Sequence, residues 1–418
     1  MKKYDLVVVG GGLSGVGAAV AAARQNLKVL LIEKTNSLGG ALSSALVFPF
    51  CPYKTWKTEE KPAKLLSGGL FTEMRERYAE KTGETVDINF DTEYFKFVLD
   101  DIVTEANIDL LLHAIVYDVK ASERNLKSVM VATKAGSTEI EADFFIDTSG
   151  DGDLFYLAGC DYLLGREEDN LCQPMTTCFR LCGVDMEKYK EEIEGLQELY
   201  KKYVHEGKIK NPRENILIFG GLPDGMLHFN TTRIVKMDPT NPMDISIAEV
   251  NARKQIFEMV DFLKKNSVAF KNAVISSVAS QIGVRESRKL KGEHILTSEE
   301  LFDCVVFEDS IALGNYDVDI HSPSGTGTVM KRFDRRKFYS IPYRSLLPKE
   351  YDNLLVAGRC ISATHEAQSS VRIMPICACL GEAAGTAIGI AKNTNTNTHT
   401  LDVKLLQKTL TDNGAQIY

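Results

Sequence analysis

The stretch that most constrains the fold is YDLVVVGGGLSGVG at residues 4–17, near the start of the 418-residue chain. The apolar run at 4–9 predicts a buried strand, and the alanine-rich run at 18–24 predicts a helix. A second apolar run at 28–32 predicts the next strand and ends at Glu33. A strand, a glycine turn, a helix and a strand within about 30 residues predict a βαβ unit.

The glycines of this turn have different physical tasks. Gly10, Gly12 and Gly15 satisfy the spacing GxGxxG. Gly10 permits the tight turn, Gly12 lets a pyrophosphate approach the backbone, and Gly15 allows the helix to pack closely on the strand. The helix N-terminus offers N–H groups and a positive dipole end to the phosphates. Glu33 can accept both ribose hydroxyls and would repel a 2′-phosphate, so the turn predicts FAD or NAD rather than NADP.

The order of the later segments favours FAD over NAD. The alternation of apolar and polar residues at 114–146 predicts short β segments, whereas two charged helices are expected at roughly 185–206 and 246–265. A sheet strand returns only at 354–358. An NAD dehydrogenase would normally complete the second half of its sheet before its catalytic domain, but this chain inserts an unlike segment first.

We therefore predict an α/β fold in which both chain ends form one domain. Residues 1–163 and 336–418 would build a Rossmann-like FAD-binding domain with a central parallel sheet, and residues 164–335 an inserted α+β substrate or cap domain. The apolar helix expected from about 375 carries glycines at four-residue spacing, which predicts close packing under the cofactor.

Composition narrows the class of protein further. There are 57 acidic and 49 basic side chains, so the net charge of −8 argues against a nucleic-acid partner. The nine cysteines include no CxxC pair, which argues against a metal site and predicts reduced thiols in a cytoplasmic protein. No apolar stretch is expected to span a bilayer, because Glu382 interrupts the longest one, at 374–391.

Several motifs together resemble a known family. They are LGGALSS, ADFFIDTSGDGDLFYLAG, IGVRESRKLKGEHILT, DIHSPSG, IPYRSLLP and NLLVAGRCISATHEAQSSVRIMP. They resemble the FAD-dependent oxidoreductases of glutathione-reductase-type fold, in the branch close to the fumarate reductase and succinate dehydrogenase flavoproteins. The resemblance implies FAD as cofactor, held by residues from both chain ends.

The cofactor contacts fall into groups along the FAD molecule. The ADP half would meet the glycine turn and the end of the second strand: Gly10, Gly12, Leu13, Ser14, Gly15, Glu33 and Lys34. The pyrophosphate, ribityl chain and ring would meet Gly39, Gly40, Ser43 and Ser44, and adenine would touch the backbone of Val116. Gly150 and Asp151 would close the sheet beside the cofactor, and the late segment would add Gly358, Arg359, Met374 and Pro375. Relatives carry an acid where this chain has Arg359, so Arg359 is expected to meet anionic parts of the cofactor or substrate.

Four residues are candidates for the chemistry. The resemblance implies that His365 faces the substrate and that Arg372 lies near the flavin. Arg285 and Arg288 are candidate anion-binding groups from the inserted segment, because the rigid fork of arginine suits a carboxylate or phosphate. If 283–290 is a strand, Arg285 and Lys289 share one face and Arg288 takes the other.

The leading function is hydride transfer between the flavin and a small organic substrate, with an anion as the favoured class, bound between the two domains. The alternative is a non-catalytic or electron-carrier flavoprotein subunit that acts with a partner protein. No second GxGxxG is present for a separate NAD(P)H domain. The electron donor or acceptor is left open among the substrate, a partner protein, a quinone and oxygen.

Overall fold

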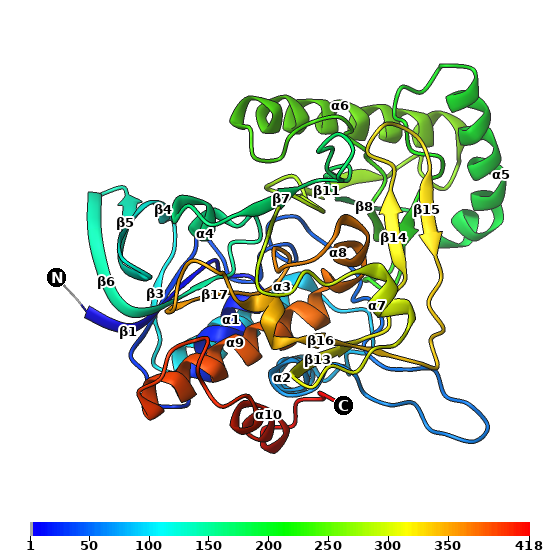
Figure 1. Cartoon of the computed structure of the whole chain (residues 1–418). Coiled ribbons are helices and arrows are strands. Elements are labelled where there is room, and N and C mark those ends of the chain that lie inside the picture. Colours follow the sequence, from blue (N-terminus) through cyan, green and yellow to red (C-terminus); the bar gives the residue numbers. More distant parts are fainter. Residues whose placement is uncertain (1–2) are drawn as a thin grey trace.

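A computed structural model describes residues 3–418 and is built around one seven-stranded sheet (Figure 1). The strands follow the order β3-β2-β1-β6-β5-β4, and β17 also pairs with β6. Their bounds are β1 Lys3–Val9, β2 Val29–Ile32, β3 Asp109–Leu111, β4 Ile115–Ser122, β5 Asn125–Thr133, β6 Gly136–Asp147 and β17 Leu354–Val356.

Strand β6 joins two kinds of pairing. Its first half pairs antiparallel with β5, and its second half pairs parallel with β1 and β17. Strands β3, β2, β1, the end of β6 and β17 therefore form a parallel sheet whose carboxyl ends meet at one edge. Because β17 lies more than 200 residues after β6, both chain ends build this sheet, and the predicted α/β fold class is confirmed.

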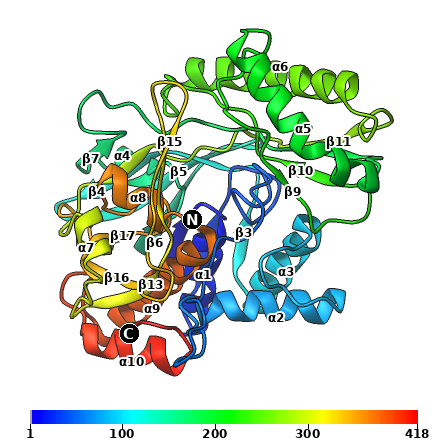
Figure 2. The ribbon, with the colours of Figure 1, turned by 90° about the vertical axis from the view of Figure 1, so that its right-hand side faces the viewer.

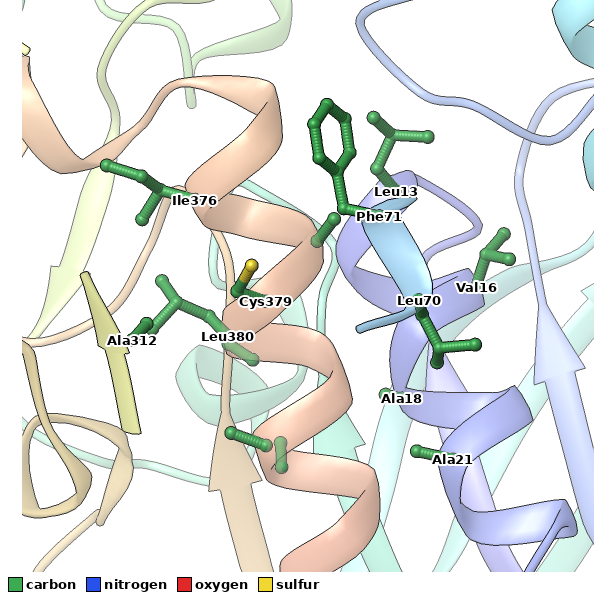
Figure 3. Packing of buried hydrophobic residues seen from close by; sticks show 14 of the residues in the cluster. Leu13, Val16, Ala18, Ala21, Leu70, Phe71, Ala312, Ile376, Cys379 and Leu380 are labelled. Carbon is green, nitrogen blue, oxygen red and sulfur yellow. The ribbon is translucent and has the colours of Figure 1, made fainter. Parts of the chain in front are cut away.

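Helices cover one face of the parallel sheet, and the antiparallel strands cover the other. On the first face α1 (Leu13–Ala23) and α9 (Met374–Thr394) pack side by side (Figure 3), with α2 (Leu70–Thr82), α3 (Thr92–Glu105) and α10 (Val403–Asp412) outside them. On the second face β4, β5 and the short helix α4 (Asp153–Leu157) pack on alternate residues of the same strands. Alternation of side chains along each strand divides the apolar residues between these two cores.

The backbones of α1 and α9 approach very closely at glycines. A Cβ atom added to Gly381 would lie 1.9 Å from the Ser14 carbonyl oxygen, and one added to Gly385 would lie 2.0 Å from that of Ala18. The glycine spacing therefore serves helix–helix packing directly beneath the glycine turn, as the sequence predicted for this helix.

Helix α9 also corrects the expectation that no segment reaches membrane-spanning length. Among residues 3–418, α9 is the one helix whose length and apolar composition would allow it to cross a bilayer. However, 94% of that stretch is buried inside the protein. Glu382 does not change this result, because one acidic residue lowers the mean hydropathy of the stretch too little to offset the surrounding apolar side chains.

Glu382 itself is buried in the middle of α9, with 3% of its surface exposed. Its carboxylate accepts a hydrogen bond from the Leu70 N–H at 2.9 Å, which caps the first turn of α2. Burial raises the pKa of this carboxyl to about 7, although the Leu70 hydrogen bond and Arg24 act in the opposite direction. The folded protein therefore binds a proton here more tightly than the unfolded chain does.

This shift predicts a pH dependence of stability. The stabilisation by the protonated Glu382 carboxyl is complete below the pKa of Glu382 in the unfolded chain, and it is lost as pH rises through about 7. This loss lowers the free energy of unfolding by on the order of 3 kcal/mol. Glu382→Gln should remove this loss, so the variant should gain stability relative to the wild type between about pH 5 and 8. Urea unfolding across that range measures it, with Glu76→Gln on the exposed face of α2 as control. Parallel curves for the wild type and Glu382→Gln would contradict the prediction.

The inserted segment contains a separate antiparallel sheet with two long helices on its outer side (Figures 1 and 2). The sheet has the order β11-β8-β10-β9, and the helices match the two predicted charged helices. The bounds are β8 Phe179–Cys182, β9 Ile218–Phe219, β10 Leu227–Phe229, β11 Val274–Val278, α5 Met186–His205 and α6 Pro242–Asn266.

Shorter elements connect the two sheets. The strand pairs are β7 with β12, β13 with β16 and β14 with β15, and this part of the chain also contains a 3-10 turn and two short helices. Their bounds are β7 Tyr162–Leu164, β12 Arg288–Leu290, β13 Ser310–Gly314, β14 Val318–His321, β15 Thr328–Lys331, β16 Tyr339–Pro342, η1 Tyr343–Leu346, α7 Ser298–Phe302 and α8 His365–Val371. The predicted strand at 283–290 is wrong in its first part, because β12 begins only at Arg288. The domain boundaries at 163 and 335 stay a prediction.

Candidate active site

The carboxyl edge of the parallel sheet gathers the predicted cofactor residues from four strands. Gly10 follows β1, Glu33 follows β2, Gly150 lies three residues after β6 and Gly358 comes two residues after β17. Gly10 has φ 107° and Gly358 has φ 89°, values in the left-handed region that favours glycine. Ligands of open α/β sheets bind outside this edge, where neighbouring strands connect in opposite directions.

The N-terminus of α1 has the properties of a phosphate cradle. The N-cap Gly12 carries no side-chain cap, and a Cβ added to it would meet only the Gly40 Cα, at 3.9 Å. The Oγ of Ser14, in the first turn, is buried and has no hydrogen-bond partner in the described chain. Open space, free donors and the helix dipole fit a pyrophosphate here. By contrast, a Cβ on Gly15 would lie 1.8 Å from the Gly10 carbonyl oxygen, which agrees with its predicted packing role.

Glu33 is held rigidly at the end of β2. It is buried, and its carboxylate accepts hydrogen bonds from the N–H groups of Gly11 at 2.6 Å and Thr35 at 2.7 Å. An ionised carboxylate has about four acceptor sites, so two remain for the ribose hydroxyls of an adenosine. The donors and acceptors at this edge therefore fit the ADP half of FAD.

Arg359 forms an ion pair within the site. Its guanidinium donates to Asp151 at 2.7 Å, and Ser287 donates to the same carboxylate oxygen at 2.8 Å. The Lys34 Nζ lies 3.7 Å from the other oxygen. Burial raises the pKa of the Asp151 carboxyl, but the charges of Arg359 and Lys34 together outweigh this effect and lower the pKa to about 2. The charge of Arg359 is therefore matched by a carboxylate on the turn after β6, and its contact with anionic parts of the cofactor or substrate stays a prediction.

The other predicted cofactor residues lie on the segments that surround this edge. The Gly39 N–H donates to the Gly11 carbonyl at 2.8 Å, which places the second glycine pair against the first turn. Ser43 and Ser44 donate to the Gly40 carbonyl, at 3.2 and 2.8 Å, and so close that turn. Val116 lies on β4, Leu13 on α1 and Gly150 beside Arg359, while Met374 and Pro375 begin α9, whose N-terminus has no side-chain cap. Their roles as FAD contacts stay predictions.

His365 lies in a buried hydrogen-bonded network. It is the first residue of α8, and the Thr364 side chain caps this helix. Its Nδ1 lies 2.9 Å from Oε1 of Glu286 and 2.8 Å from Oε2. The Lys289 Nζ donates to Glu286 at 2.5 Å and to the Gly165 carbonyl at 2.9 Å. Within residues 3–418 the Nε2 of His365 has no hydrogen-bond partner.

Arg285 and Arg372 lie in a second group, around Asp319. The Arg285 guanidinium donates to the Pro174 carbonyl at 2.7 Å and to the Thr176 hydroxyl. Burial, then the charge of Arg372, lowers the pKa of Arg285 to about 9. Burial raises the pKa of Asp319, but a hydrogen bond from His321 and the charges of Arg372 and Arg285 hold it below its ordinary value.

A third arginine adds to this positive charge. Arg213 is buried, and it lowers the pKa of Arg285 by repulsion, next in effect after burial and Arg372. Three guanidinium groups therefore lie within electrostatic range of Asp319. The other acids in range, Glu214 beside Arg213 and Glu286 beside Arg372, are already paired with Arg233 and Lys289. Positive charge is therefore in excess in this buried region. Such an excess favours an anion. We refer to Arg213, Arg285, Arg372 and Asp319 as the arginine cluster.

Gln173 links the arginine cluster to His365. Its backbone N–H donates to Glu286 at 3.0 Å, and its side-chain oxygen accepts from Arg372 at 3.2 Å. Its Nε2 is buried and has no partner among the described residues, so a donor is free at this junction. The structure thus places His365, Arg285 and Arg372 in one connected region.

Arg288 does not join this region. It donates to the Asp151 carbonyl at 3.0 Å and to Asp153 at 3.1 Å, and its guanidinium lies 4.1 Å from the centre of the Tyr156 ring. The opposite faces predicted for Arg285 and Arg288 depended on a strand over 283–290, but Arg285 lies outside β12. The geometry gives no support to a substrate role for Arg288.

Sequence reasoning missed Gln173, Arg213, Glu286 and Asp319. Glu286 stands between two candidate residues in the motif RESRK. An acidic residue within this basic run could have indicated that Glu286 belongs to the site. Gln173, Arg213 and Asp319 have no motif of their own, and only the approach of distant segments gives them a place in the site.

Comparison with known proteins supports this assignment. The family model for FAD dependent oxidoreductases matches residues 5–410, so the chain belongs to the FAD-dependent oxidoreductase family. FAD is the cofactor that the family and the geometry of the carboxyl edge both indicate. The narrower fumarate reductase-like branch stays a prediction.

One curated relative and two solved structures are similar to the chain. Digeranylgeranylglycerophospholipid reductase 1 of Methanococcoides burtonii is 28% identical over 196 residues, which are 44% of this chain and 46% of that protein, so the match spans less than half of the relative. A geranylgeranyl bacteriochlorophyll reductase-like protein from Thermoplasma acidophilum has a TM-score of 0.50 at 14% identity, covering 99% of this chain and 84% of its own. A flavoprotein/dehydrogenase from Cytophaga hutchinsonii has a TM-score of 0.48 at 14% identity, covering 98% and 84%.

Proposed function

We propose that this FAD-dependent oxidoreductase transfers a hydride between the flavin and a small organic anion bound at the arginine cluster. The observation that carries the proposal is the excess of buried positive charge: Arg213, Arg285 and Arg372 lie within electrostatic range of Asp319, and the other nearby acids are already paired with Arg233 and Lys289. Leaving buried charges uncompensated is costly, so an anionic ligand would stabilise the site. FAD supplies the two-electron chemistry when bound.

The residues of the chain divide the remaining work. Arg285 and Arg372 would bind and orient the anion, and the free Nε2 group of Gln173 could donate a further hydrogen bond. His365 would hold or take up a proton at Nε2. This arrangement agrees with the fumarate reductase-like branch that the motifs resemble, and we propose that branch for this chain.

A long isoprenoid substrate, such as the name of the curated relative indicates for that protein, suits the cluster less well. The phosphate of such a glycerophospholipid would pair with the guanidinium groups, but its long apolar chains would lie against the polar and charged side chains around them. An electron-carrier role with a partner protein is the remaining alternative.

The test uses anaerobic reduction of the purified yellow holoprotein. We expect the visible flavin absorbance to bleach with a member of a panel of hydroxy acids, dicarboxylates and sugar acids, and to be unaffected by an unsaturated isoprenoid alcohol. Bleaching by the isoprenoid but by none of the anions would overturn the anionic substrate. Protein that no compound bleaches, but that copurifies with a partner which reoxidises it, would favour the carrier.

Arg372→Met should separate anion binding from cofactor binding. The loss of one charge-assisted interaction of about 1.5–3 kcal/mol should raise the half-saturating concentration of the bleaching anion roughly ten- to a hundredfold. FAD content and melting temperature should change little. Arg336→Met, on an exposed loop, is the matched control and should behave as the wild type. An unchanged half-saturating concentration in Arg372→Met would remove the cluster from the substrate site.

A further inference from the structure

A buried carboxylate joins His365 to a buried lysine. The side chain of Glu286 is fully buried, that of Lys289 is 1% exposed and that of His365 is 6% exposed. Glu286 accepts from His365, from Lys289 and from the Gln173 N–H, so its hydrogen-bonding capacity is largely used. Three buried polar groups that satisfy one another form a stiff unit, because breaking any contact leaves a desolvated polar atom unpaired.

We propose that Glu286 and Lys289 are positioning residues that orient the ring of His365, with the Nδ1–H donating to Glu286 and Nε2 free toward the substrate. The inference rests on the proposed function in one respect, which is the place of His365 beside the substrate. The tautomer follows from the chemistry of the pair: an ionised carboxylate can only accept, so the ring proton lies on Nδ1.

Lys289 holds the carboxylate of Glu286 in place. Its Nζ donates to Glu286 at 2.5 Å and to the Gly165 carbonyl at 2.9 Å. The carboxylate therefore cannot turn away from the ring without leaving a buried lysine unpaired. Burial raises the pKa of Glu286, but the His365 hydrogen bond and the Lys289 charge lower it more, which keeps the carboxylate ionised.

Other charged groups around this unit act more weakly. Asp169 lies within electrostatic range of His365, but it is exposed and already paired with Arg166 at 2.7 Å. Arg372, at the end of α8, is within electrostatic range of Glu286. Burial, then the charge of Glu286, raises the pKa of Cys172 to about 12, so this thiol is neutral.

The test reads the ring of His365 directly and needs no substrate. Holoprotein with 15N-labelled histidines is studied by long-range proton–nitrogen NMR, and the His365 signals are those lost in His365→Ala. In the neutral ring we expect the proton on Nδ1. Lys289→Met should raise the share of the Nε2–H tautomer at least twofold, because Glu286 is then free to turn away from the ring. Lys291→Met, on the exposed neighbour of the same segment, should leave the tautomer ratio unchanged.

Glu286→Gln should abolish the tautomer preference, because an amide can donate as well as accept. A neutral wild-type ring protonated on Nε2, or a tautomer ratio unchanged in Lys289→Met, would overturn the proposal. If Glu286→Gln does not fold, the wild-type spectrum and Lys289→Met still decide. If the spectra agree but no compound bleaches the flavin, the proposed function fails and the positioning by Glu286 and Lys289 stands.

Discussion

Gly12→Ala is expected to give a folded protein that has lost FAD. The added Cβ would meet only the Gly40 Cα, at 3.9 Å, and Gly12 has φ −65°, so the free protein can accept alanine without strain. The same methyl group would occupy the space into which the pyrophosphate must come. Crowding of about 1–3 kcal/mol should weaken FAD binding roughly five- to a hundredfold. The flavin-to-protein ratio and titration of the apoprotein with FAD measure this loss.

Gly15→Ala is the matched control in the same turn. Its Cβ would lie 1.8 Å from the Gly10 carbonyl oxygen, so here the methyl group collides with the protein itself. We expect Gly15→Ala to lower the melting temperature as well as the FAD content, whereas Gly12→Ala lowers the FAD content alone. Full retention of FAD in Gly12→Ala would show that the cofactor does not approach this backbone.

Gly385→Ala is expected to destabilise the whole protein. A Cβ on Gly385 would lie 2.0 Å from the Ala18 carbonyl oxygen, which is backbone and cannot swing away. The two helices would have to separate, and their contact forms part of the main core beneath the site (Figure 3). Overpacking of this kind costs on the order of 3 kcal/mol, more than the helix gains from alanine. Thermal unfolding of the holoprotein and the apoprotein measures the loss.

The same substitution at Gly195 should have the opposite sign. Gly195 lies inside α5, is exposed, and an added Cβ would meet nothing within 4 Å. Gly195→Ala should therefore stabilise the protein by about 0.5–1 kcal/mol through helix propensity alone. A stable Gly385→Ala variant with unchanged melting would contradict the packing of α9 on α1.

The cofactor half of the site was predictable because its signals are local. The glycine turn, the strands on either side and Glu33 lie within one βαβ unit, and each residue type is required by backbone geometry or by the chemistry of a dinucleotide. The substrate half was less predictable. His365 and Arg372 were identified through family resemblance, but the strand expected at 283–290 is only β12, and Arg288 proved to face Asp153.

The amino-acid sequence alone determined the α/β class, the FAD site at the start of the chain and the return of the chain to the same sheet near its end. Local spacing and periodicity carry that information. Only the tertiary structure decided which charges meet. Glu286 joins His365 to Lys289, and Gln173 joins this unit to Arg372, across as many as 199 residues. Such pairings depend on how separate segments pack against one another, and no spacing along the chain encodes them.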